Sequence, residues 1–221
     1  MLVGRTPERL DAAAADIGAT SVVAHLSRPD GPAAAVRSAE GQLSGLDLLV
    51  VNSGGPPAGR FEQLGEAEWA AAIEGTLQSA LRLIRAALPH LRVGVDPAIL
   101  VNLSSSVREP ISGLTTSNVL RPGLAGLIKN LCEEIVPIRI NGVAPGRFDT
   151  ERVRALDTAR AAADGLTVEE VRHRTETRIP LGRYGDTTEI GRVATFLLSP
   201  AASYVTGAIV SVDGGMVRAL P

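Results

Sequence analysis

The chain has 221 residues, of which 45% are hydrophobic, so it can build one domain with a sizeable core and is not an intrinsically disordered chain. Its net charge of −2 gives no electrostatic basis for binding a nucleic acid. No apolar run approaches the length of a membrane span, and the first residues show no secretory signal pattern. We therefore expect a cytoplasmic protein that binds neither nucleic acid nor membrane.

Apolar runs typical of strands alternate with longer runs typical of helices, an order that favours βαβ units and a parallel sheet. The predicted strands are residues 2–3, 21–25, 46–51, 98–103, 138–141 and 208–212. The predicted helices are residues 7–17, 31–43, 66–91, 116–135, 167–178 and 187–198. The sequence thus predicts a single α/β domain over residues 1–221, Rossmann-like, with a doubly wound parallel sheet in a three-layer α/β/α arrangement.

Several details refine this prediction. The strands at 46–51 and 98–103 do not alternate in polarity, which is typical of strands buried on both faces. Helix 66–91 carries one predicted apolar face, made by Trp69, Ile73, Leu77, Leu81, Ile84 and Leu88. Segment 151–182 is polar and irregular apart from its helix, and it is interpreted either as a cover over the substrate or as a solvated surface helix.

The cysteine and the histidines give little sign of chemistry. Cys132 is the only cysteine, and we interpret it as a buried structural thiol rather than a nucleophile because no histidine is near it in the sequence. His25, His90 and His173 are far apart and show no metal-ligand spacing, so no metal site is expected.

Small and polar residues follow three of the predicted strands directly. The motifs are Asn52-Ser53-Gly54-Gly55, Ser104-Ser105 and Pro145-Gly146, the last preceded by Asn141. Open α/β sheets bind ligands outside the carboxyl ends of their strands, so these motifs predict a ligand site. The alternative for the first and third motifs is a plain turn at the end of a strand.

Together with Asp213-Gly214-Gly215 near the end of the chain, these motifs resemble the short-chain dehydrogenase/reductase family. The resemblance implies an oxidoreductase similar to the 3-oxoacyl reductases, acting on a small carbonyl/alcohol substrate with NADP or NAD. It also implies a homodimer or homotetramer. The positions that match the family's cofactor contacts are Arg5, Ser27, Asn52, Ser53, Gly54, Gly55, Pro145, Gly146, Phe148 and Thr150. Arg5 lies where a cation meets the 2′-phosphate, so NADP is favoured.

The catalytic positions depart from the family pattern. Ser105 matches the family's serine, but Ser117 and Arg121 stand where the family has its Tyr-x-x-x-Lys pair, and Thr76 stands where the family has an asparagine. A phenol with a pKa near 10 can be drawn towards neutrality by a neighbouring cation, whereas a serine hydroxyl stays protonated. Arg121 can polarise an oxygen or clamp a carboxylate, but it cannot shuttle a proton. The alternative is a capping serine and a surface arginine.

The family's first strand and glycine-rich turn find no match in the sequence, which begins at a segment similar to the second strand. That turn places the cofactor pyrophosphate at a helix N-terminus, so we expect weak NAD(P) binding. Its strand is central in the family's sheet, so we expect unpaired strand edges. Two hypotheses follow: an oxidoreductase with slow or altered chemistry, and a non-catalytic family member that acts as a binding or structural subunit.

Overall fold

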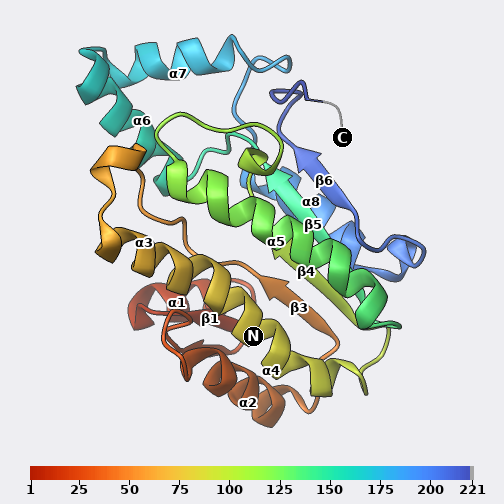
Figure 1. The fold of residues 1–221 in the computed structure, drawn as a ribbon. Coiled ribbons are helices and arrows are strands. Elements are labelled where there is room, and N and C mark those ends of the chain that lie inside the picture. Colours follow the sequence, from red (N-terminus) through yellow and green to blue (C-terminus); the bar gives the residue numbers. More distant parts are fainter. Residues whose placement is uncertain (220–221) are drawn as a thin grey trace.

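The computed structural model describes residues 1–219 (Figure 1). Its strands are β1 (Leu2–Gly4), β2 (Ser21–Val23), β3 (Leu48–Val51), β4 (Ala98–Asn102), β5 (Arg139–Pro145) and β6 (Ile209–Val212). Its α-helices are α1 (Pro7–Asp16), α2 (Gly31–Leu43), α3 (Glu66–Ala72), α4 (Ser79–Leu91), α5 (Thr115–Glu134), α6 (Glu151–Asp164), α7 (Val168–Glu176) and α8 (Thr187–Leu198). Shorter turns are η1 (Phe61–Gln63), η2 (Ile73–Gln78), η3 (Ser105–Val107) and η4 (Pro200–Ala202).

Four strands form a parallel sheet in the order β3-β4-β5-β6, with Val50 opposite Leu100 and Leu100 opposite Asn141. Helices α4 and α5 cover one face, and α8 packs on the other (Figure 1). The fold is therefore the predicted Rossmann-like α/β arrangement of three layers. Residues 98–101 of β4 are all buried, which confirms that this strand is covered on both faces.

Strands β1 and β2 pair only with each other in the part of the chain that the structure describes. Strand β3 consequently has one open edge. Leu48 and Val50 are 47% and 51% exposed while Leu49 and Val51 are buried, so the prediction that this strand is buried on both faces is wrong. The open edge confirms the expectation of unpaired edges between the segment that contains Leu2 and Val3 and the strand at Leu48–Val51. An open edge of this kind is a site where another strand can add.

The long helix predicted over 66–91 is interrupted by one π-helical turn, η2, between α3 and α4. A π turn contains more residues per turn than an α-helix, so it rotates the face that the rest of the helix presents. The residues that are buried are Ala72, Thr76, Ser79, Ala80, Leu83, Ile84, Ala87 and Leu91. Of the predicted apolar face, Ile84 is buried and Leu77 and Leu88 pack partly buried against the core, whereas Ile73 is exposed, so the prediction is only partly confirmed.

Segment 151–182 contains two helices, α6 and α7, where the sequence predicted only the second. Thr150 caps α6 by accepting a hydrogen bond from the Val153 amide at 3.3 Å, and the left-handed Gly165 ends that helix. Thr167 and Glu170 form a capping box at the start of α7, which confirms a helix within the predicted range 167–178. Both helices lie beyond the carboxyl end of β5 (Figure 1), where α6 contributes to the cavity described below.

Cys132 is half-buried rather than buried, and its thiol donates to the Lys129 carbonyl oxygen at 3.0 Å. No helix within residues 1–219 combines the length and the apolar character that a membrane crossing requires. The same residues contain no group of three or more His, Cys, Asp or Glu side chains arranged to hold a metal ion.

Candidate active site at the carboxyl edge of the sheet

A cavity of about 440 Å³ opens where β4 and β5 end. Residues from the loops after β3, β4 and β5 line it on one side, and residues of α6 line it on the other. The predicted site residues that meet in its wall are Gly55, Ser105, Ser117, Arg121, Pro145 and Gly146. Three chain segments that are distant in sequence therefore converge as predicted. A cavity of this size suits a small molecule.

Ser104 and Ser105, which follow β4, line the cavity. Ser104 caps the short turn η3 by accepting a hydrogen bond from the Ser106 amide, and this places the buried Ser105 at the cavity wall. The Ser117 hydroxyl lies 3.1 Å from the Ser106 hydroxyl. Ser117 sits inside α5 and is buried, so the interpretation of Ser117 as a capping serine is wrong.

Arg121 is one turn further along α5 and is only 5% exposed, so it is not a surface arginine. One Nη donates to the backbone oxygen of Asn102 at the end of β4, whereas Nε has no partner among the described residues. Burial, and then the charge of Arg152, lower the pKa of Arg121 to about 10, which leaves the side chain charged at neutral pH. This permanent cation therefore lies beside two serine hydroxyls in a partly closed cavity.

Thr76 is fully buried on the π turn η2, which packs against α5, but it does not line the cavity. Its Oγ1 lacks a hydrogen-bond partner in the described chain, as does Oδ1 of Asn102. Buried polar atoms without partners are uncommon and often mark a place where water or a ligand completes the structure. π turns also occur often at functional sites.

The predicted cofactor positions are spread along the same edge of the sheet. Arg5 and Ser27 are exposed beyond the ends of β1 and β2. Asn52 Oδ1 accepts a hydrogen bond from the side-chain Nδ2 of Asn102 at 2.9 Å. Ser53 and Gly54 follow in the loop after β3, and a Cβ at Gly54 would meet no atom within 4 Å. A ligand backbone or ring therefore has room to approach at Gly54.

Phe148 and Thr150 are not in the cavity wall. Phe148 is buried against Gly185, where a Cβ would come within 2.6 Å of the Phe148 ring. The Thr150 side chain caps α6, as described above. Any contact of these two residues with a cofactor therefore has to come from their backbone groups.

The arginines between residues 147 and 178 that line the cavity were not predicted as site residues. Besides Arg121, the cavity is lined by Arg147, Arg152, Arg160 and Arg178, against a single acidic residue, Glu109. The signal was present in the sequence as a high density of arginine after Pro145-Gly146, but the segment was interpreted only by its polarity. Because α6 was not predicted, nothing indicated which of these side chains would turn towards the sheet.

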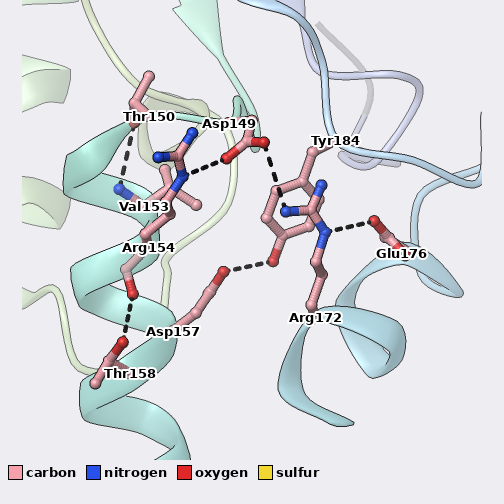
Figure 2. Close-up of polar contacts among 9 residues, drawn as sticks. All are labelled: Asp149, Thr150, Val153, Arg154, Asp157, Thr158, Arg172, Glu176 and Tyr184. Carbon is pink, nitrogen blue, oxygen red and sulfur yellow. Dashed lines mark hydrogen bonds and ion pairs between the residues drawn. The ribbon is translucent and has the colours of Figure 1, made fainter. Parts of the chain in front are cut away.

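A polar network ties α6, α7 and the loop before α8 together (Figure 2). Tyr184 donates to a carboxylate oxygen of the buried Asp157 at 2.8 Å, and the Arg172 guanidinium stacks on the Tyr184 ring at 4.5 Å. Asp149 joins the network through Arg154 and Arg172, at 2.8 and 3.6 Å. Burial raises the pKa of Tyr184, which lies outside the cavity wall, so this phenol does not substitute for the family's tyrosine.

We expect Tyr184→Phe to lower the free energy of unfolding by about 1–3 kcal/mol, because it leaves an oxygen of buried Asp157 without its hydroxyl donor. Urea unfolding would measure the change. The matched control is Tyr204→Phe, since Tyr204 is fully exposed and its substitution should change stability by less than about 0.5 kcal/mol. Equal effects of the two substitutions would contradict a structural role for the Tyr184–Asp157 bond.

The chain is similar to several known proteins in sequence and fold. A family model described as enoyl-(acyl carrier protein) reductase matches residues 3–217. The 3-oxoacyl-(acyl-carrier-protein) reductase FabG of Chlamydia trachomatis is 32% identical over 194 residues, which are 86% of this chain and 73% of that protein.

Two solved structures are also similar. L-sorbose reductase from Gluconobacter frateurii, complexed with NADPH and L-sorbose, has a TM-score of 0.91 at 26% identity and covers 99% of this chain and 87% of its own. An NADPH-bound short chain oxidoreductase from Pseudomonas aeruginosa PAO1, described as containing an atypical catalytic center, has a TM-score of 0.86 at 27% identity. That match covers 99% of this chain and 86% of the other.

Proposed function

Because the chain belongs to the short-chain dehydrogenase/reductase family, we propose that it transfers hydride between a nicotinamide cofactor and a small carbonyl/alcohol pair, as a 3-oxoacyl reductase does. The observation that carries the proposal is the convergence of Ser105, Ser117 and Arg121 on one cavity beside Pro145-Gly146. When bound, the cofactor supplies or accepts the hydride; the residues of the chain orient the substrate and manage its oxygen.

In this proposal the Ser105 hydroxyl donates a hydrogen bond to the substrate oxygen. Arg121 places a positive charge in the same cavity, because its guanidinium stays charged there. Ser117 can donate a hydrogen bond but is a poor general acid near pH 7, since its hydroxyl is far less acidic than a phenol. Turnover is consequently slow compared with an enzyme that has the tyrosine.

The loops after β3 and β5 suit the nicotinamide end of a cofactor. Gly54 leaves open space after β3, and backbone groups of Phe148 and Thr150 follow Pro145-Gly146.

We expect Arg5→Ala to weaken NADP binding by about tenfold and to leave NAD binding unchanged, because only NADP offers a 2′-phosphate to the exposed cation. Calorimetric titration with each cofactor measures the difference. Arg37→Ala, at an exposed arginine on α2, is the control for loss of positive charge. A parent protein that prefers NAD, or an equal loss for both cofactors in Arg5→Ala, would remove Arg5 from the site.

We expect the protein to form a homodimer or homotetramer. Strand β6 ends the sheet with a free edge, and Ile209, Val210 and Val212 on it are only half-buried. Ala80 and Ala87 on the apolar helix α4 are buried in the core of the chain itself, so they are not available to a partner. Sedimentation velocity at micromolar concentration should show a species larger than a monomer, and a lone monomer boundary would contradict the expectation.

NADPH oxidation with small ketones, followed by absorbance, tests the proposal directly. Slow but saturable turnover that Ser105→Ala abolishes would support it. The second candidate function is a non-catalytic binding subunit. It is favoured by the 3.1 Å contact between the Ser117 and Ser106 hydroxyls, because this contact engages the Ser117 hydroxyl within the chain. That candidate predicts ligand binding with no turnover in any variant.

A further inference from the structure

We propose that the substrate of this cavity is a short-chain oxo acid whose carboxylate is held by Arg121 and Arg152. The proposal deepens the function given above, and its catalytic consequence rests on that function. Its binding claim concerns only residues of this chain.

Arg121 is a buried cation with an unpaired donor that could bind an anion. Its side chain is 5% exposed and lines the cavity, and Nε has no partner among residues 1–219. Its one recorded hydrogen bond goes to the neutral backbone oxygen of Asn102. Burying an arginine with an unpaired donor and no carboxylate beside it is costly, so an anion arriving at this position would recover much of that cost.

Arg152 reaches the same region from α6. Its Nη2 donates to the backbone oxygen of Pro56 at 2.8 Å, and its guanidinium lies against Gly55, where a Cβ would come within 2.9 Å of it. The charge of Arg152 is close enough to contribute to the lowered pKa of Arg121. Two cations thus approach each other from α5 and α6. Neither has a carboxylate within ion-pair distance in the part of the chain that the structure describes.

Two other cavity arginines differ from this pair. Arg147 lies 3.4 Å from Asp157, and Arg160 pairs with Asp164 on its own helix, so both charges are balanced. Among the described residues, the cavity arginines without an ion pair are Arg121, Arg152 and Arg178, against one acidic residue, Glu109. Of these three cations, Arg121 and Arg152 lie close enough for the charge of one to lower the pKa of the other.

The chemistry of the ligand follows from these groups. Guanidinium groups bind carboxylates through two parallel N–H donors, a geometry that a ketone or an alcohol cannot satisfy. Ser105 and Ser117 line the same cavity and can meet a keto oxygen while the carboxylate rests on the arginines. The volume of about 440 Å³ is enough to hold a short oxo acid.

The test uses calorimetric titration of the cofactor-free protein at 25 °C with acetoacetate and, separately, with its neutral methyl ester. We expect acetoacetate to bind saturably and at least tenfold more tightly than the ester. Arg152 is exposed, so Arg152→Gln should fold normally and should bind acetoacetate at least tenfold more weakly than the parent. Arg121→Gln should also bind acetoacetate at least tenfold more weakly. Arg154→Gln, two residues along α6 and paired with Asp149 outside the cavity, is the matched control and should bind like the parent.

Three results would overturn the proposal: equal binding of acid and ester, unchanged affinity in both Arg121→Gln and Arg152→Gln, or binding of inorganic phosphate at matched ionic strength without binding of acetoacetate. The proposed function is judged separately. Acetoacetate binding that depends on Arg152, with no NADPH oxidation, would support the anion site and contradict the reductase. Oxidation of NADPH by the methyl ester as fast as by the acid would support the reductase and contradict the anion site.

Discussion

The double substitution Ser117→Tyr with Arg121→Lys is expected to raise the rate of carbonyl reduction by about 10²–10⁴-fold. It restores a phenol whose pKa a neighbouring ammonium group can lower, and general acid assistance of this kind typically contributes a factor of that size. Ser117 lines the cavity, so a larger ring at this position extends into open space rather than into the core. The rate would be measured as NADPH oxidation at cofactor concentrations that saturate each variant.

Ser117→Phe with Arg121→Lys is the matched control, because it adds the same ring without its hydroxyl. A gain of similar size in this control would show that packing, not proton transfer, limits the parent. A parent rate already on the order of 10 s⁻¹, which is ordinary for enzymes, would also contradict the assignment of slow turnover to the missing phenol.

The second large effect is expected at Asn141, where Asn141→Ala should lower the free energy of unfolding by about 2–5 kcal/mol. Asn141 is 1% exposed and its side chain connects β5 to the segment that leads into β6: Nδ2 donates to the Val205 backbone oxygen at 2.8 Å, and Oδ1 accepts from the Ala208 backbone amide at 3.0 Å. Removing the side chain leaves both part-buried backbone groups without this partner.

Denaturant unfolding measures this loss, and Asn130→Ala is the control, since Asn130 is exposed and bonds only to Glu134 on its own helix. Its substitution should change stability by about 0.5 kcal/mol or less. A loss at Asn141 as small as that at Asn130 would mean that water replaces the lost contacts, and that the asparagine before Pro145-Gly146 does not hold β6 in place.

The parallel sheet could be predicted from sequence because strands buried on both faces form continuous apolar runs, as Ile99, Leu100 and Val101 do. Helices α2 and α8 were predicted with the ends that the structure shows, since a glycine or proline marks the start of one and a capping aspartate the start of the other. The open edge of β3 followed from the absence of a matching central strand.

Other features had no local signal. Helix α6 buries only Asp157 and Ala161, so it shows no apolar periodicity from which a helix could be predicted. The π turn η2 adds no recognisable residue pattern, yet it changes which face of the long helix meets the core. The pairing of Ser106 with Ser117 depends on how η3 packs against α5, which is a tertiary contact.

The position of the candidate site could be predicted, but its charge could not. Strand-end motifs located Ser105, Ser117, Arg121 and Pro145-Gly146, which the structure brings to one cavity. Arg152 was missed because its contribution depends on α6 folding back over the sheet. Sequence spacing alone does not show that a residue after Pro145-Gly146 will lie against Gly55.

The most direct test of the proposed function follows the transferred hydride with an isotope. The protein is incubated for a long period with acetoacetate and millimolar NADPH that carries deuterium on the transferred position of its nicotinamide, and the product is analysed by mass spectrometry. We expect deuterium at C3 of 3-hydroxybutyrate, formed at a rate well below the roughly 10 s⁻¹ of an ordinary enzyme and lost in Ser105→Ala. Absence of deuterated product, under conditions in which calorimetry shows that both NADPH and acetoacetate are bound, would contradict a reductase function.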